Sequence, residues 1–392
     1  MKSFCNLRLS MMFIPLIAGC SLNSGQDTNQ ISLTSDYDSV VPQLLKKTSV
    51  PGIALAVIQD GDVLFSRSYG YSALQPAALV SDSTCFNIGS VSKTLTAWGV
   101  MKLVEEGLID LDEDVDQYLK RWHLPRSEYD HRRVTIRRLL NHTSGLSNYP
   151  MNELLNGYPV DSELPSIEEA LSRAFPVFGN LRLIEEPGEN YQYNNGNYLI
   201  LQLLIEEVTG IPFNRYMDSV VFNPLGMSHT GYKLSYNMAT GYNEVNEPYM
   251  LYNYVEKGSG GLLTTARDLA LFLCATDSDG DLEPGRGVLK PETIDMMMTP
   301  TLETRGLSGL GYQVNLLRKI GYFIGHEAAN DGYRSIILFD PQKHAGLVIL
   351  SNSDKGGLIF AEIICMWTKW AGIELAYPCP EPRVPDIAMI IR

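Results

Sequence analysis

Apolar residues predict strands near both ends of the chain and helices between them. The runs 52–58 and 63–67 are rich in aliphatic residues, and the Asp60-Gly61 pair between them is typical of a hairpin turn. Further strands are predicted over 312–317, 334–339 and 345–350. The two groups of strands therefore enclose a middle that is poor in strands.

That middle, about residues 95–300, carries helical patterns at 96–106 and at 198–209, and the second is closed by Gly210. A further apolar helix is predicted over 356–371. The simplest arrangement is an α+β fold. One antiparallel sheet is built from both chain ends, with flanking helices and an inserted, mainly helical region.

The first 20 residues are typical of an export leader, because a basic start precedes a short apolar run and small residues. The stretch "LIAGC" resembles the lipobox of bacterial lipoproteins, in which Cys20 would be lipidated. Ser21 after it favours the outer membrane, facing the periplasm. The alternative is an ordinary cleaved signal peptide, and the protein is exported under either interpretation.

Composition divides the remainder into three parts. Residues 21–35 are mostly small and polar and predict a flexible tether, 36–375 form the folded domain, and 376–392 form a proline-rich tail. The formal net charge is −14 and no basic run is present, so a nucleic-acid partner is not expected. The six histidines show no metal-ligand spacing, so neither a metal nor another cofactor is predicted.

The cysteines allow one disulfide in an oxidising compartment. Cys365 and Cys379 are the pair closest in sequence, but the sequence leaves open whether they are joined. Cys85 and Cys274 lie in apolar contexts and are predicted to be buried thiols.

Ser90 and Lys93 are the first candidates for chemistry. A serine hydroxyl is a weak nucleophile at neutral pH and needs a neighbour that accepts its proton. Residues three apart share one face of a helix, so a helix that begins near Gly89 would let Lys93 reach Ser90. Burial of that helix would lower the pKa of the lysine and make it a base. The alternative is that Ser90 only caps the helix.

Two further motifs accompany this pair, Tyr193-Asn194-Asn195 and His326-Glu327-Ala328. With Ser90 to Lys93 as S-x-x-K, the chain resembles the penicillin-recognising serine hydrolases, which include class C β-lactamases, D,D-peptidases, esterases and aminopeptidases. The resemblance runs from about residue 37 to 372. It implies a β-lactamase/transpeptidase-like fold.

The resemblance also implies a role for each motif residue. Ser90 would be the nucleophile and Lys93 would assist its deprotonation. Tyr193 would be the base during acylation and the acid for the leaving group, which requires the charge of Lys93 to favour tyrosinate. Asn195 would orient the acyl side chain and the lysine. The backbone N–H groups of Ser90 and Ala329 would form the oxyanion hole.

The third motif departs from the β-lactamase pattern. His326 replaces a lysine that attracts the substrate carboxylate, and a neutral histidine offers only a hydrogen bond. Ala328 replaces a glycine, and its methyl group would point at the pocket or at the strand behind it. His142 is assigned to loop structure. The tyrosine-rich stretch 249–261 is equally compatible with a pocket rim and with packed surface.

The sequence thus predicts an exported serine hydrolase that forms a covalent acyl-enzyme. Its expected substrate is a small ester, or an amide or peptide with a D-residue, and its expected location is lipid-anchored in the cell envelope. The alternatives are a β-lactamase and a catalytically silent lipoprotein that binds an envelope component. The natural substrate, oligomeric state and physiological role stay open.

Overall fold

The computed structural model describes residues 24–147, 157–160, 162–173, 180–234, 237–279, 284–314, 316–317 and 322–375. The predicted leader at 1–20, with Cys20, and the predicted tail at 376–392 lie outside these residues.

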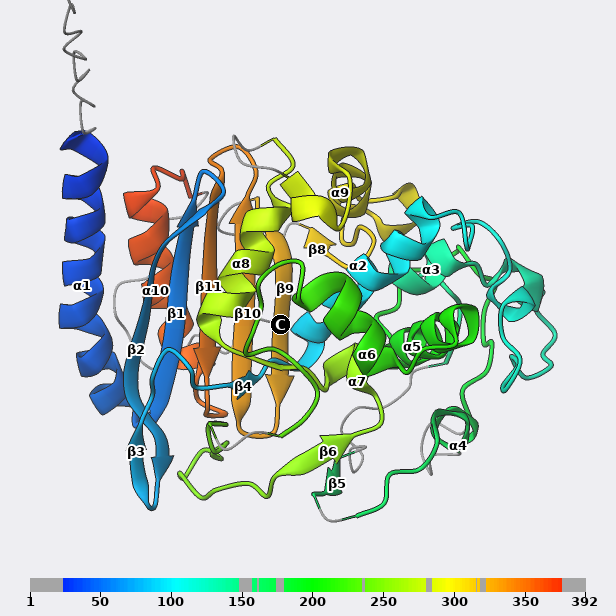
Figure 1. Cartoon of the computed structure of the whole chain (residues 1–392), viewed down its shortest axis with the longest axis horizontal. Helices are drawn as coiled ribbons and strands as arrows, with labels where there is room; N and C mark the ends of the chain where they lie inside the picture. The colour runs from blue at the N-terminus through cyan, green and yellow to red at the C-terminus, as the bar shows by residue number, and fades with distance from the viewer. Residues whose placement is uncertain are drawn as a thin grey trace, which may run out of the picture.

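A seven-stranded sheet occupies one end of the molecule (Figure 1). Its strand order is β3-β2-β1-β11-β10-β9-β8, and all neighbours are antiparallel, so strands from both chain ends meet where β1 pairs with β11. This confirms the predicted fold class. The strands of this sheet are β1 (Gly52–Gln59), β2 (Asp62–Leu74), β3 (Ala77–Leu79), β8 (Gln313–Val314), β9 (Ile324–Asn330), β10 (Tyr333–Asp340) and β11 (Ala345–Ser351).

The remaining strands are short. β4 (Phe86–Asn87) pairs with β7 (Leu263–Thr264), and β5 (Gly157–Pro159) pairs with β6 (Tyr252–Tyr254). The α-helices are α1 (Ser24–Thr48), α2 (Ser92–Glu105), α3 (Ile136–Leu140), α4 (Ile167–Ser172), α5 (Asn195–Thr209), α6 (Phe213–Met217), α7 (Lys257–Gly260), α8 (Ala266–Thr276), α9 (Pro291–Met298) and α10 (Gly357–Trp370).

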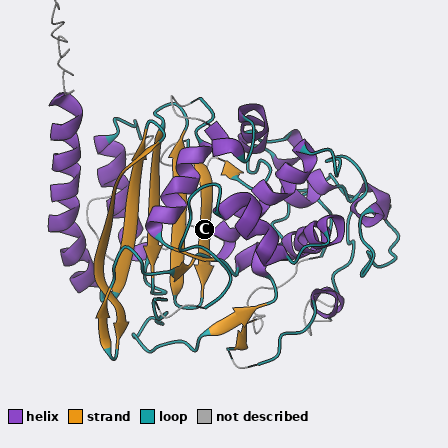
Figure 2. Ribbon diagram, in the orientation of Figure 1, coloured by secondary structure: helices purple, strands orange, loops and turns teal. Residues whose placement is uncertain are grey.

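The sheet is buried on both faces, as β1 illustrates. Side chains alternate across a strand, so Ile53 and Leu55 enter one buried cluster while Ala54 and Ala56 enter the other. Helices α1 and α10 cover the first face, and α8 crosses the second, which continues into the helical region (Figures 1 and 2). The site described below lies where that helical region meets β9.

The expected tether at 21–35 is wrong from Ser24 onward, where helix α1 begins. Leu33, Tyr37, Val41 and Leu45 recur every four residues and are buried. The Tyr37 hydroxyl donates a hydrogen bond to the carbonyl of Ile363 in α10 at 3.1 Å. The composition of residues 21–35 did not indicate this helix, because most of the apolar residues that pack it against the protein come after residue 35.

The third motif lies on a strand that the sequence analysis did not predict. His326 belongs to β9, and the strand expected at 312–317 is reduced to β8. The stretch from Ile324 to Asn330 mixes small, polar and charged residues, so it lacks the apolar alternation that marks a half-buried strand.

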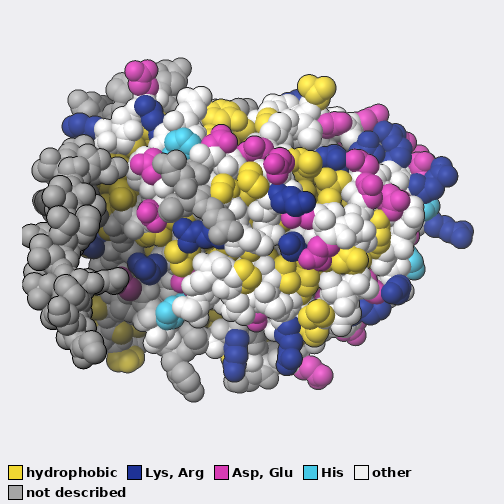
Figure 3. Space-filling view, turned by 45° about the horizontal axis from the view of Figure 1, so that its top comes forward, with side chains coloured by type: hydrophobic (Ala, Val, Ile, Leu, Met, Phe, Trp, Pro, Cys, Tyr) yellow, Lys and Arg dark blue, Asp and Glu magenta, His cyan; other side chains and the backbone are white. Residues whose placement is uncertain are grey.

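Two of the three described cysteines, Cys85 and Cys274, are buried thiols, as predicted. Cys365 is disulfide-bonded. Cys379 lies outside the described residues, so its pairing with Cys365 stays a prediction. Within the described parts of the chain, no helix is long and apolar enough to cross a membrane. Acidic and basic side chains are interspersed at the helical end of the face shown in Figure 3.

Candidate active site

Ser90 lies in a tight turn that leads into helix α2. The turn is a short 3₁₀ segment, Gly89–Val91, and the residue at the N-cap of α2 is Val91, with no side-chain cap. The alternative that Ser90 merely caps the helix is therefore excluded. Gly89 has φ of +48°, and a Cβ there would lie 3.0 Å from the Ala328 Cβ, so this close approach to β9 requires glycine.

Two asparagines fasten this turn to its surroundings. The Asn87 carboxamide oxygen accepts hydrogen bonds from the Gly89 N–H at 2.9 Å and from the Asn330 amide at 2.6 Å. The same Asn330 amide donates to the carbonyl of Gly260 at 3.2 Å. The nucleophile turn, the end of β9 and helix α7 are thus tied together by buried or half-buried hydrogen bonds.

Lys93 reaches Ser90 as the spacing predicted. Its Nζ lies 3.2 Å from the Ser90 Oγ and 2.6 Å from the carbonyl oxygen of Ser259, and the side chain is fully buried. Burial lowers the pKa of Lys93 well below its usual value. The lowered pKa favours the neutral amine, which is the form that can accept the Ser90 proton.

Tyr193 is presented by a loop that leads directly into α5. The Asn194 side chain accepts a hydrogen bond from the Gly196 N–H at 2.9 Å and donates to the carbonyl oxygens of Leu146 and Ser147. These contacts fix the loop, and the Lys93 Nζ lies 5.0 Å from the centre of the Tyr193 ring. Asn195, the first residue of α5, follows immediately.

The protonation state of Tyr193 differs from the expectation. Burial raises the pKa of Tyr193, and the Ser90 hydroxyl only partly opposes this. The predicted tyrosinate is therefore not supported, because burial favours the neutral phenol and no nearby group reverses that effect. The buried Tyr193 hydroxyl interacts with the Ser90 hydroxyl and has no other hydrogen-bond partner among the described residues, so it faces the reacting atom.

His142, assigned to loop structure, also belongs to the site. Its ring lies against Tyr193 with centroids 4.4 Å apart, and its Nδ1 accepts a hydrogen bond from the Asn194 N–H at 3.2 Å. Burial lowers the pKa of His142 well below its usual value, so the ring is neutral. The sequence analysis predicted that His142 would make hydrogen bonds in a loop. It did not predict the contact with Tyr193, because that contact joins residues about 50 positions apart in the chain.

His326 and Ala329 come to the site from β9. The His326 Nδ1 donates to the Glu327 carbonyl at 2.7 Å, which leaves Nε2 as an acceptor. The pKa of His326 is lowered to about 3, chiefly by burial, so the side chain is neutral. The Ala328 methyl group faces Gly89, and Ala329 is exposed on the same strand. β8 pairs with β9 only at Ile324 and Gly325, before these residues.

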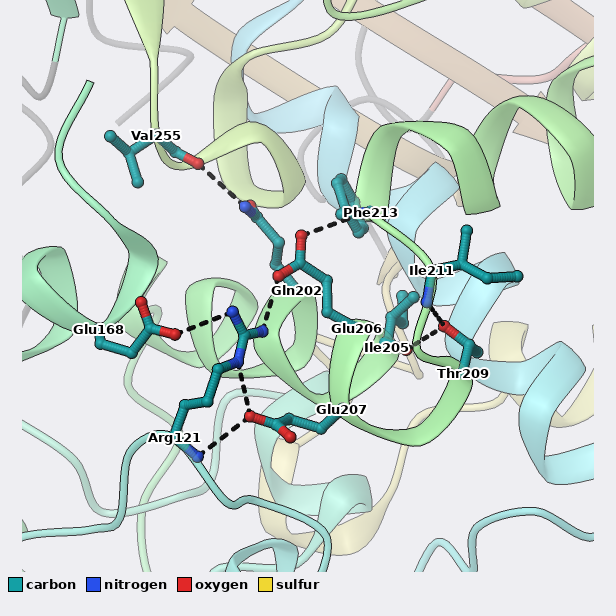
Figure 4. Close-up of polar contacts among 10 residues, drawn as sticks. All are labelled: Arg121, Glu168, Gln202, Ile205, Glu206, Glu207, Thr209, Ile211, Phe213 and Val255. Carbon is teal, nitrogen blue, oxygen red and sulfur yellow. Dashed lines mark hydrogen bonds and ion pairs between the residues drawn. The ribbon is translucent and has the colours of Figure 1, made fainter. Parts of the chain in front are cut away.

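The stretch 249–261 contributes a backbone atom that the sequence analysis missed, the Ser259 carbonyl that holds Lys93. Gln202 of α5 fixes helix α7 by donating to the Val255 carbonyl at 3.0 Å and accepting from the Gly258 N–H at 2.9 Å. Figure 4 also shows Arg121, which bridges Glu168 of α4 to Glu206 and Glu207 of α5. These contacts hold helix α5, whose first residue is Asn195, in a fixed position.

The arrangement combines a serine, a neutral amine and a protonated phenol within one buried cluster. This set can accept a proton from the nucleophile and return one to a leaving group. The described residues contain no cluster of ligands that could hold a metal ion.

The lowered pKa of Lys93 predicts how the reaction rate falls on the acid side of the pH–rate profile. We expect kcat/KM for an ester to fall with decreasing pH through a limb that lies well below the usual pKa of a lysine, because the ammonium form cannot accept the Ser90 proton. Steady-state rates across pH, with folding followed by circular dichroism, measure this. A profile that rises only near pH 10, about the pKa of a free lysine, would contradict it.

Three comparisons place this geometry among known proteins. Residues 37–361 match the family model described as Beta-lactamase. Protein flp of Staphylococcus aureus (strain MRSA252) is 25% identical over 334 residues, which are 82% of this chain but only 64% of flp. The octameric penicillin-binding protein homologue from Pyrococcus abyssi has a TM-score of 0.68 at 26% identity, covering 82% of this chain and 74% of that one.

A class C beta-lactamase shares the fold, with a TM-score of 0.68 at 20% identity over 88% of this chain and 98% of the other.

Proposed function

Because the chain belongs to the beta-lactamase family of serine hydrolases, we propose that it hydrolyses an ester, or an amide or peptide with a D-residue, through a covalent acyl-enzyme. One observation carries the proposal, the 3.2 Å contact between the Lys93 Nζ and the Ser90 Oγ. A buried neutral amine at this distance is what a serine needs to become a nucleophile.

Acylation begins when the Ser90 Oγ attacks the carbonyl carbon and Lys93 takes the hydroxyl proton. The carbonyl oxygen becomes an oxyanion, which the backbone N–H groups of Ser90 and Ala329 would stabilise. As the bond to the leaving group breaks, Tyr193 gives that group its phenolic proton and recovers a proton from Lys93. The products are the acylated Ser90 and the released alcohol or amine.

Deacylation reverses the direction of proton flow. A water molecule attacks the acyl carbon and gives its proton to Tyr193, while Tyr193 passes its own phenolic proton to the unprotonated Lys93. The acyl–oxygen bond then breaks, Ser90 regains a hydroxyl proton, and the carboxylic acid leaves. Asn195 would orient the acyl side chain throughout, and the Nε2 acceptor of His326 would hold a polar hydrogen of the substrate.

A paired assay tests this function. Initial hydrolysis rates of p-nitrophenyl butyrate and nitrocefin are measured with the chain lacking residues 1–20, with Ser90→Ala as the control. We expect Ser90-dependent ester turnover with little nitrocefin turnover, because the neutral His326 offers a substrate carboxylate no charge.

Other outcomes would favour the alternatives. Efficient Ser90-dependent nitrocefin hydrolysis would assign the site to a β-lactamase. Absence of turnover on either substrate, together with failure of a fluorophosphonate to label Ser90 in folded protein, would favour a silent binding protein and contradict the proposal.

For location, we propose lipid anchoring through Cys20 in the cell envelope, supported by the "LIAGC" stretch. Radiolabelled palmitate should be incorporated into the full chain in a bacterial host and lost in Cys20→Ala. Equal labelling of both proteins, or of neither, would contradict the anchor.

A further inference from the structure

His142 contacts the loop that carries Tyr193 on both sides of the tyrosine. Its backbone carbonyl accepts a hydrogen bond from the Gln192 N–H at 2.8 Å, and its Nδ1 accepts one from the Asn194 N–H at 3.2 Å. Its ring lies against the Tyr193 ring, with centroids 4.4 Å apart. One residue therefore holds the residue before Tyr193, the residue after it and the phenol ring itself.

The backbone of His142 is held in an uncommon conformation by its neighbours. Its φ of +63° lies in the left-handed region, which residues other than glycine rarely adopt. The His142 N–H donates to the Leu139 carbonyl at 3.4 Å, and the carbonyl of the next residue, Thr143, accepts from the Gly188 N–H at 2.8 Å. A strained conformation that its surroundings fix in this way is typical of a residue with a task in the site.

The Nδ1 atom of His142 serves as an acceptor. The Asn194 N–H points at it, and the side-chain nitrogen of Asn197 lies 3.4 Å away. The Asn197 carboxamide oxygen accepts from the Ser144 hydroxyl at 2.8 Å, so its amide nitrogen is the atom that faces the imidazole. Two donors thus converge on Nδ1, which places the ring proton on Nε2. Burial keeps this neutral form by lowering the pKa of His142.

Tyr193 needs such contacts because no helix or strand fixes its direction. It lies on a loop, and helix α5 begins only at Asn195. Its hydroxyl nevertheless has to meet the Ser90 hydroxyl, with which it interacts in the buried site. The direction of the phenol toward Ser90 therefore depends on contacts made by the loop, and His142 supplies those described above.

We propose that His142 is a positioning residue, which directs the Tyr193 hydroxyl at Ser90 and the leaving group by accepting the Asn194 N–H and packing against the phenol. Holding a proton donor in place raises the rate, because misplacement by about 1 Å can cost about 10²-fold. This inference rests on the proposed function, in which Tyr193 protonates the leaving group. It deepens that function by naming what orients the acid.

The test compares two esters that differ in their need for a proton. Phenolate is as basic as an ordinary tyrosinate, with a pKa of about 10, so it takes a proton from Tyr193 as it leaves. p-Nitrophenolate is far less basic and leaves without a proton. For each protein, in detergent and with the full chain, kcat/KM for phenyl butyrate is divided by kcat/KM for p-nitrophenyl butyrate. General effects of a substitution on folding or acyl-chain binding cancel in this ratio.

His142→Phe keeps a ring against Tyr193 and removes the acceptor, so we expect the ratio to fall at least about tenfold. His142→Asn loses the ring, but its Oδ1 is the same number of bonds from Cβ as Nδ1, and asparagine tolerates a positive φ. We expect it to keep the ratio within about threefold of wild type. If His142→Phe does not fold, His142→Gly replaces it, because glycine adopts the positive φ freely and lacks an acceptor.

His123→Phe is the matched control. His123 is exposed, and its Nδ1 lies 3.2 Å from an Asp116 carboxylate oxygen, so its loss should leave the ratio within about twofold of wild type. A ratio within about twofold of wild type in folded His142→Phe would overturn the inference. An equal fall in His142→Phe and His142→Asn would also overturn it, because the Nδ1 acceptor would then not be what orients Tyr193.

Failure of the proposed function has a different signature. If wild type hydrolyses neither ester, the function fails, and the inference is then decided by amide hydrogen exchange over residues 190–196, read by mass spectrometry. Loss of the acceptor in His142→Phe should speed exchange of the Asn194 amide at least about tenfold, whereas His142→Asn should keep the wild-type rate. Equal exchange in the three proteins would overturn the inference.

Discussion

Ser90→Ala should reduce kcat/KM for p-nitrophenyl butyrate by at least about 10³-fold, because it removes the only atom that can form the acyl-enzyme. Binding contacts and the two backbone N–H groups stay in place, so a small residual rate above the uncatalysed reaction is expected. Initial rates under kcat/KM conditions measure the loss. The protein itself should stay folded, since the Ser90 hydroxyl caps no helix.

Ser228→Ala provides the control. Ser228 is exposed and hydrogen-bonds the neighbouring His229, so its loss should leave the rate near that of wild type. A fluorophosphonate should label wild type and Ser228→Ala but not Ser90→Ala. Ester turnover that survives in Ser90→Ala would show that another residue is the nucleophile and would refute the proposed mechanism.

Tyr193→Phe should lower kcat on the same ester by about 10²- to 10⁴-fold, the usual contribution of a general acid or base. The substitution keeps the ring that packs against His142 and removes only the hydroxyl, which is buried and whose one hydrogen-bonding neighbour among the described residues is the Ser90 hydroxyl. We therefore expect unchanged or higher thermal stability together with the loss of rate. Burst kinetics would report whether acylation or deacylation is the slower step.

Tyr129→Phe is the matched variant, because Tyr129 is a half-buried tyrosine on a loop between α2 and α3. It should retain wild-type rates. Near-wild-type turnover by Tyr193→Phe would remove Tyr193 from the chemistry and leave Lys93 to exchange protons with both the nucleophile and the leaving group.

Much of the fold could be predicted from the local pattern of apolar and turn residues in the sequence. Apolar runs and turn residues predicted the strands that became β1, β10 and β11, and the helical periods became α2, α5 and α10. The predicted α+β sheet built from both chain ends is confirmed by its strand order. The errors fall where the pattern is weak: β9 lacks apolar alternation, and the stripe that secures α1 begins near the end of the supposed tether.

For the site, the local spacing of Ser90 and Lys93 and the order of the motifs along the chain were enough to predict which residue types could do the chemistry. The pKa shifts of these residues could not be predicted in this way, since burial depends on what packs around a group in the folded protein. The fold also brings the Ser259 carbonyl to Lys93 and the His142 ring to Tyr193. Such contacts join residues distant in the chain, and no local pattern encodes them.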